Sequence, residues 1–124
     1  MMNNKKIPVF DIALGEIEKK YIKECVDTSF IGQGPYVKKL EEKFSAFVDC
    51  KYGITTTSGT TALHLACAVL DIKKDDQVLV SSSTNMACPF VIDYCGAIPI
   101  PIDIEKDTWQ MDVSQIEEKI NDKT

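Results

Sequence analysis

Arginine is absent from this 124-residue sequence: all fourteen basic residues are lysines, and nineteen acidic residues bring the net charge to −5. A nucleic-acid-binding domain usually clusters Lys and Arg and is basic overall, so this acidic chain argues against DNA or RNA as a partner. Without arginine the chain also has no bidentate guanidinium clamp for a phosphate or carboxylate. An anion would have to be bound by backbone amides, hydroxyl groups, lysine or a partner subunit.

Long hydrophobic runs and clustered metal ligands are also missing. No apolar run approaches the roughly 20 residues that cross a bilayer, and residues 7–10 are too short for a signal-peptide core, so we expect no membrane span and a cytoplasmic location. The sequence has one histidine, His64, and its five cysteines form no C-x-x-C pair, so no metal site is predicted. Their odd number favours free thiols in a reducing compartment.

Hydrophobic spacing divides the chain into a helical segment, residues 1–50, and an alternating segment, residues 51–124. In the first segment, apolar residues recur every three or four positions, which predicts two amphipathic helices separated by a loop with two glycines and a proline. The expected elements are helices at 15–29 and 37–48, then strands at 52–57, 77–81 and 98–104 alternating with helices at 61–70, 86–94 and 113–120. Asp112 or Ser114 is expected to cap the last helix.

This strand–helix alternation predicts right-handed βαβ units, that is, an α/β fold with a parallel sheet covered by helices. Three strands make a small sheet with an open edge, so we expect residues 1–124 to be a single incomplete domain, the front part of a larger one. The expected core consists of ten apolar residues: Ile54, Leu63, Ala66, Leu70, Val78, Leu79, Val80, Val91, Ile100 and Ile102.

A glycine flanked by hydroxyl residues follows the first expected strand, in the sequence Thr57-Ser58-Gly59-Thr60-Thr61. In an open parallel sheet, ligands bind beyond the carboxyl ends of the strands. At a helix start the amides of residues 59–61 lack intrahelical partners, and the helix dipole favours an anion. The segment is therefore a candidate phosphate site, although an ordinary capped helix start has a similar composition. It matches neither a Walker A loop nor a G-x-G-x-x-G fingerprint.

The segment TSGTTALHLA at 57–66 resembles the cofactor-phosphate segment of the DegT/DnrJ/EryC1/StrS family. Members of this family are pyridoxal-phosphate-dependent aminotransferases that act chiefly on nucleotide-linked keto-sugars. Further motifs follow in the family's order: GQGPYV at 32–37, LEEKF at 40–44, DQVLV at 76–80, Thr84, YCGAIP at 94–99 and IDI at 102–104. The resemblance covers about residues 7–120, and several motifs in the correct order make it specific.

The resemblance implies the N-terminal part of the large domain of a type I, aspartate-aminotransferase-like fold. It implies that Ser58, Gly59 and Thr60 bind the phosphate of pyridoxal 5'-phosphate. Asn85 falls where family members usually carry an aromatic ring or histidine stacked on the pyridine ring of the cofactor. Asparagine offers no aromatic face for such stacking. The alternative for Asn85 is a turn or helix-capping role. His64 is not expected to be catalytic, because it lies a full turn inside its helix.

The implied activity transfers an amino group from an amino-acid donor to a nucleotide-linked keto-sugar, in amino-sugar and cell-surface polysaccharide biosynthesis, and the complete enzyme is expected to be a homodimer. We assign no catalytic residue to this chain, because Lys51, Lys73 and Lys74 lie at the wrong end of the sheet and Lys106 lies between acidic residues. By resemblance, the Schiff-base lysine and the aspartate partner of the pyridine nitrogen belong beyond residue 124. Two alternatives stay open: a relative that uses the same cofactor for sugar dehydration, and a non-catalytic, truncated pseudo-enzyme that binds a phosphorylated ligand.

Overall fold

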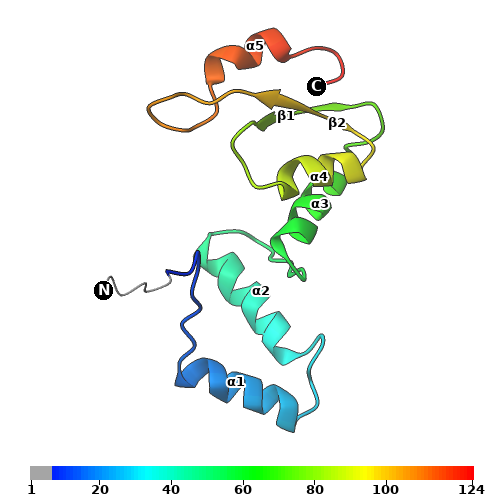
Figure 1. The fold of residues 1–124 in the computed structure, drawn as a ribbon. Helices are drawn as coiled ribbons and strands as arrows, with labels where there is room; N and C mark the ends of the chain where they lie inside the picture. Colours follow the sequence, from blue (N-terminus) through cyan, green and yellow to red (C-terminus); the bar gives the residue numbers. More distant parts are fainter. Residues whose placement is uncertain (1–6) are drawn as a thin grey trace, which may run out of the picture. The chain divides into compact units, whose positions relative to one another are not determined.

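The computed structural model describes residues 7–124, which divide into two compact units on either side of the Gly53–Ile54 bond (Figure 1). The first unit is helical, and the second contains both helices and a small sheet. Within the described part of the chain, no helix has the length and apolar character that spanning a membrane would require.

The first unit contains two helices, α1 (Glu16–Asp27) and α2 (Pro35–Phe47), so both amphipathic helices are confirmed. At the start of α1, the Gly15 N–H donates to the Glu18 carboxylate at 2.7 Å, which satisfies an amide that the helix itself leaves unpaired. Helix α2 begins with Pro35 at its first position, where the missing N–H costs nothing and the fixed φ already suits the helix.

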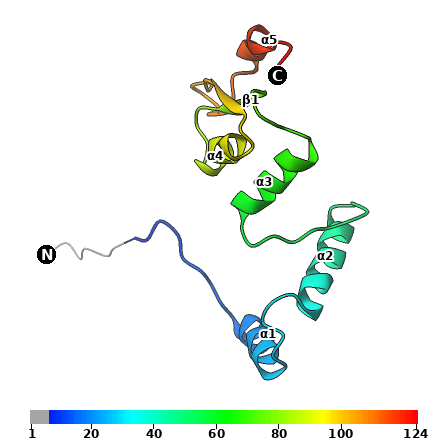
Figure 2. The ribbon, with the colours of Figure 1, turned by 90° about the vertical axis from the view of Figure 1, so that its right-hand side faces the viewer.

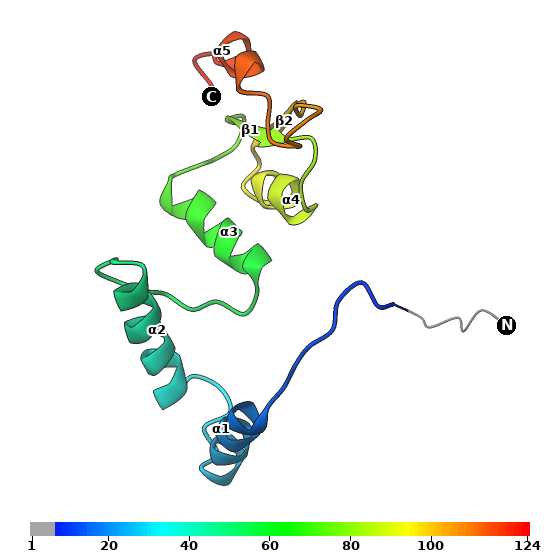
Figure 3. The same cartoon turned by 90° about the vertical axis from the view of Figure 1, so that its left-hand side faces the viewer.

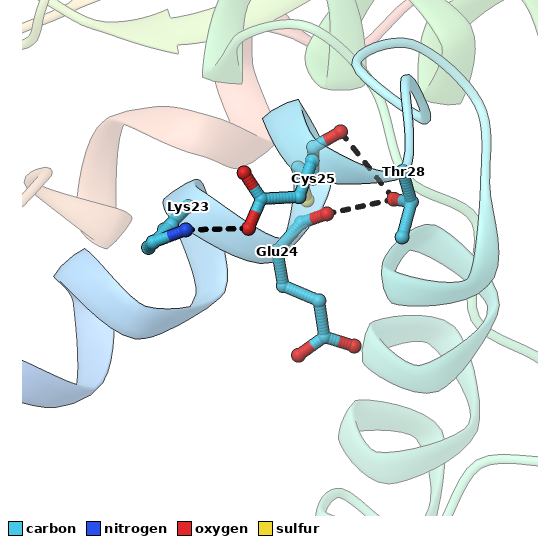
Figure 4. Close-up of polar contacts among 5 residues, drawn as sticks. Lys23, Glu24, Cys25 and Thr28 are labelled. Carbon is cyan, nitrogen blue, oxygen red and sulfur yellow. Dashed lines mark hydrogen bonds and ion pairs between the residues drawn. The ribbon is translucent and has the colours of Figure 1, made fainter.

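The end of α1 is held by local polar contacts, drawn in Figure 4. The Thr28 hydroxyl donates to the Glu24 carbonyl at 2.7 Å, which also accepts the Thr28 N–H at 3.0 Å, and the hydroxyl lies 3.4 Å from the Cys25 carbonyl. One turn earlier, the Lys23 ammonium lies 2.6 Å from the Asp27 carboxylate. Exposed pairs of this spacing stabilise a helix only slightly.

Aromatic side chains join α1 to α2. The rings of Tyr21 and Tyr36 lie 5.0 Å apart in a tilted arrangement, and the Lys39 ammonium lies 5.4 Å from the centre of the Tyr36 ring. A hydrogen bond to the Glu24 carboxylate is the main cause that raises the pKa of Tyr36 to about 12. Partial removal of water and nearby negative charge raise this pKa further.

In the second unit, two strands and their connecting helix form a parallel βαβ unit: β1 (Gln77–Ser81), α4 (Ala87–Tyr94) and β2 (Ile98–Ile102). The strands pair in register from Gln77 with Ile98 to Ser81 with Ile102. The predicted α/β class with parallel strands is therefore confirmed. Helix α3 (Gly59–Val69) packs against α4, and α4 packs on the strands (Figure 2).

The last residues of the second unit and helix α4 lie on opposite faces of the two strands (Figure 3). A 3₁₀ turn, η1 (Val113–Gln115), leads into the short helix α5 (Ile116–Lys119), so the expected final helix is split and shorter than predicted. The Asp112 carboxylate accepts the Ser114 N–H at 3.0 Å, which confirms Asp112 as the cap. Hydrogen bonds from Ser114 and Gln115 lower the pKa of Asp112.

The Gln77 N–H donates to the Lys123 carbonyl at 2.7 Å, which brings the last residues beside the start of β1.

Gly96 makes the tight turn from α4 into β2. Its φ of 74° is a left-handed conformation that side-chain-bearing residues rarely adopt. A Cβ at this position would also lie 3.4 Å from the backbone of Lys74. Because the turn closes so tightly, β2 returns directly alongside β1.

The strand predicted at 52–57 does not form, so the sheet of the described residues has two strands and not three. Residues 54–57 form neither helix nor strand and lead into α3, and the Ile54 side chain is 75% exposed. The β-branched composition of this segment suits a strand, but a strand also needs a neighbour to pair with, and none of the described segments supplies one. The third predicted strand is shorter than expected, with Ile104 in an isolated antiparallel bridge to Met111.

The core is formed between α4 and the strands, where four apolar side chains are almost completely buried: Val91, Ile92, Ala97 and Ile102. Of the ten predicted core residues, Val91 and Ile102 are buried, and four more are half-buried: Val78, Leu79, Val80 and Ile100. The other four are exposed, so the prediction is wrong for them: Ile54, Leu63, Ala66 and Leu70. Ile54 was predicted to lie in the strand at 52–57, which does not form, and the other three lie on α3 and its C-terminal end.

Candidate functional site

The start of α3 is shaped by a reciprocal hydrogen-bonded cap between Ser58 and Thr61. Ser58 has an extended backbone, and its hydroxyl oxygen accepts the Thr61 N–H at 3.2 Å. In return, the Thr61 hydroxyl oxygen accepts the Ser58 N–H at 3.0 Å and donates its proton to the Ser58 carbonyl at 2.8 Å. This capping box fixes the point at which the chain changes from extended to helical.

Hydrogen-bond donors remain available between these two residues. The first backbone bond that closes α3 runs from the Ala62 N–H to the Ser58 carbonyl at 3.0 Å, so the amides of Gly59 and Thr60 have no helical partner. The Thr60 hydroxyl forms no hydrogen bond with any described residue. Our expectation that the Thr61 amide is also free is wrong, because Ser58 accepts it.

This donor set suits a phosphate. Two amides and a hydroxyl lie at the N-terminus of an eleven-residue helix, where the dipole favours negative charge. The Ser58 hydroxyl accepts the Thr61 N–H in the cap, and its proton is shared between the Thr61 hydroxyl oxygen, 3.2 Å away, and any further acceptor that binds there. A Cβ at Gly59 would meet nothing within 4 Å, so the backbone there is open to close approach.

Asn85 lies after the carboxyl end of β1 and immediately before Met86, the N-cap residue of α4. Its side-chain oxygen accepts the Ala87 N–H at 2.9 Å, and its carbonyl accepts the Cys88 N–H at 3.0 Å. The side chain therefore bonds the backbone of the turn that leads into α4, in line with the turn alternative. The side-chain NH₂ of Asn85 has no partner among residues 7–124, and no hydrogen bond within that range joins Asn85 to Ser58, Gly59 or Thr60.

Hydroxyl groups gather where the two strands end. The Ser82 hydroxyl lies 3.4 Å from the Asp103 carboxylate, which joins the loops after β1 and β2. The Thr84 hydroxyl lies 3.3 Å from the Cys88 sulfur at the start of α4. The carboxyl edge of the sheet, where ligands bind in open parallel sheets, is therefore polar.

Side chains elsewhere in the second unit have structural contacts. The His64 and Tyr94 rings meet edge to face at 5.7 Å and join α3 to α4. Burial raises the pKa of the Cys67 thiol, and the neighbouring thiol of Cys95 raises it further. The Lys73 ammonium lies 3.1 Å from the Asp71 carboxylate, and this bond raises the pKa of Lys73. Residues 7–124 contain no group of three or more His, Cys, Asp and Glu side chains that could hold a metal ion.

A parallel βαβ unit, and a helix packed on it whose start is capped and rich in donors, define an α/β protein with the features of a phosphate-binding site. The chain belongs to the DegT/DnrJ/EryC1/StrS aminotransferase family, which residues 13–124 match. It is 44% identical over 121 residues to the GDP-perosamine synthase of Escherichia coli O157:H7, covering 97% of this chain and 33% of that protein. It is 37% identical over 119 residues to the GDP-perosamine synthase of Vibrio cholerae, covering 95% of this chain and 32% of that protein.

Solved structures support the same relationship. Spr1654 of Streptococcus pneumoniae, assigned as a sugar aminotransferase and solved in its PMP form, is 32% identical with a TM-score of 0.90, covering 96% of this chain and 30% of that one. The E. coli GDP-4-keto-6-deoxy-D-mannose-3-dehydratase with bound hydrated PLP is 26% identical with a TM-score of 0.85, and the match covers 96% of this chain and 32% of that one. The chain spans about a third of the length of the curated relatives it matches.

Proposed function

We propose that this chain is the N-terminal part of a pyridoxal-phosphate-dependent aminotransferase that transfers an amino group from an amino acid to a nucleotide-linked keto-sugar. Membership of the aminotransferase family supports the reaction class. The substrate class is supported by the two relatives named GDP-perosamine synthase, which favour a GDP-linked sugar. The observation that carries the proposal is the set of unpaired donors at the start of α3.

In this proposal, the Gly59 and Thr60 amides and the Ser58 and Thr60 hydroxyls bind the phosphate of pyridoxal 5'-phosphate. The bound cofactor supplies an electron sink for negative charge that develops on carbon. The chain's own residues anchor the phosphate and thereby fix where the cofactor ring lies. The open space at Gly59 fits this role, because a phosphate oxygen can approach the backbone there without meeting a side chain.

Asn85 is proposed to lie beside the cofactor ring, with its NH₂ group as a donor. Its side-chain oxygen already accepts the Ala87 N–H at the start of α4, which holds the amide in one orientation. An amide in this place gives a polar contact where an aromatic residue would give stacking.

A sugar dehydratase that uses the same cofactor is the second candidate function. It is favoured by the TM-score of 0.85 to the E. coli dehydratase. The higher identity to the two perosamine synthases, 44% and 37% against 26%, favours amino transfer. The residues that would decide between the two chemistries are proposed to lie beyond residue 124.

Assembly and location complete the proposal. We place the complete enzyme in the cytoplasm as a homodimer, with its product used in cell-surface polysaccharide synthesis. The cytoplasmic placement is supported by the five cysteines, which are all free thiols, as is usual in reducing compartments.

Binding of the cofactor's phosphate tests the proposal. In the complete protein freed of cofactor, pyridoxal 5'-phosphate should bind much more tightly than pyridoxal, which lacks the phosphate. The Thr60→Val variant should reduce that preference, because it removes a donor hydroxyl and keeps the side-chain shape. Equal binding of both compounds by the unmodified protein would contradict the proposal. A parallel assay with a GDP-linked keto-sugar and glutamate should yield the amino sugar.

A further inference from the structure

The Thr61 side chain makes four polar contacts within one short turn. Its hydroxyl oxygen accepts the Ser58 N–H at 3.0 Å and donates to the Ser58 carbonyl at 2.8 Å. The same oxygen lies 3.2 Å from the Ser58 hydroxyl and 3.4 Å from the Thr57 hydroxyl. Thr61 therefore contacts both backbone polar groups of Ser58, the residue that immediately precedes Gly59. The Ser58 carbonyl also accepts the Thr56 hydroxyl at 2.9 Å and the Ala62 N–H at 3.0 Å, whereas the Ser58 N–H has Thr61 as its partner among residues 7–124.

The Thr61 hydroxyl has no capacity left for a ligand. A hydroxyl has one proton and two lone pairs, and here the proton goes to a carbonyl while one lone pair takes an amide proton. The hydroxyls of Ser58 and Thr57 compete for the second lone pair. The adjacent Thr60 differs, because its hydroxyl has no partner among residues 7–124.

We propose that Thr61 is a positioning residue for the phosphate: its hydroxyl locks the turn so that the free donors of Gly59 and Thr60 converge, and it does not contact the phosphate itself. This inference rests on the proposed function, since it concerns the same phosphate site.

The hydrogen bonds from Thr61 to Ser58 matter because Ser58 is followed by Gly59. Gly59 has no Cβ to restrict its backbone, so an unlocked turn would sample many conformations that aim the amides elsewhere. Binding would then have to order the turn, and that cost weakens the complex. A turn already ordered by Thr61 avoids this cost.

The test compares three variants of the complete, cofactor-free protein. Thr61→Val keeps the β-branched shape and removes the hydroxyl, whereas Thr61→Ser keeps the hydroxyl. Thr108→Val is the matched control, since it removes a threonine hydroxyl that binds Glu105 at 2.7 Å, outside the proposed site. For each variant, dissociation constants are measured for pyridoxal 5'-phosphate and for pyridoxal.

We expect Thr61→Val to bind pyridoxal 5'-phosphate roughly tenfold more weakly, the size of a typical lost helix cap, and to bind pyridoxal as the unmodified protein does. Thr61→Ser and Thr108→Val should bind both compounds normally. The inference is overturned if Thr61→Val keeps its affinity for the phosphorylated compound, if it loses affinity for both equally, or if Thr61→Ser does not restore binding. If Thr61→Val does not fold, the serine variant still decides, because weakened binding there contradicts a role for the hydroxyl. An unmodified protein that binds neither compound overturns the proposed function, and this inference with it.

Discussion

Adding a methyl group at Gly59 should raise stability and lower phosphate affinity at the same time. A Cβ at this position meets nothing within 4 Å, so alanine fits without a clash. Cα–Cβ bonds of a helix tilt toward its N-terminus, so at the first residue of α3 the methyl group projects into the space in front of the helix. That is the space in which the phosphate is proposed to bind.

The two effects have opposite signs and different sizes. Replacing a helical glycine by alanine stabilises a protein by about 0.5–1 kcal/mol, because less backbone entropy is lost on folding. Blocking one hydrogen bond to a charged phosphate costs about 1.5–3 kcal/mol. At 1.4 kcal/mol per tenfold, this corresponds to a loss of affinity of roughly 10- to 100-fold. Gly59→Val should lose more affinity, because its side chain is larger.

Urea unfolding of the cofactor-free protein gives the stability, and titration with pyridoxal 5'-phosphate gives the affinity. Gly32→Ala is the matched control, since a Cβ at Gly32 also meets nothing within 4 Å and this residue lies outside the proposed site. The control should bind the cofactor normally. Unchanged affinity in Gly59→Val would remove this turn from the phosphate site and refute the reasoning.

Three further predictions concern titrating and nucleophilic side chains. The fold favours the neutral Tyr36 phenol, so the contribution of this phenol to stability is present below its ordinary pKa of 10.0. That contribution is lost as the pH rises through about 12. The Glu24→Gln variant should return the pKa of Tyr36 toward 10.0 in an absorbance titration. A thiol reagent should modify the exposed Cys50 before Cys67, because burial raises the pKa of Cys67, and mass spectrometry of partly labelled protein checks the order. Residues 1–124, mixed with pyridoxal 5'-phosphate and reduced with borohydride, should show no stoichiometric adduct on one lysine; an adduct at Lys106 would place the catalytic lysine in this chain.

Local patterns were sufficient to predict most of the secondary structure. Gln77–Ser81 is a strand with the predicted bounds, and Gly96 ends α4 as expected, because each depends on residues close in the sequence. Ile54 shows where such reasoning fails. Its segment has strand composition, but pairing needs a partner strand, and the local pattern contains no information about whether a partner is present.

The candidate site was predictable in outline only. The hydroxyl-rich composition of the turn located the donors at Gly59 and Thr60. It could not reveal that Ser58 would accept the Thr61 amide, because this depends on side-chain rotamers in the folded turn. Thr61 was identified only as part of the motif, and its four polar contacts became visible only in three dimensions.

A crystal structure of the complete protein with pyridoxal 5'-phosphate tests the central claim most directly. We predict phosphate oxygens within about 3.2 Å of the Gly59 amide, the Thr60 amide and the Thr60 hydroxyl, which is the usual range for such bonds. The Thr61 hydroxyl should remain bonded to Ser58 and should not contact the phosphate. A cofactor whose phosphate lies elsewhere, with the start of α3 in contact only with solvent, would contradict the account.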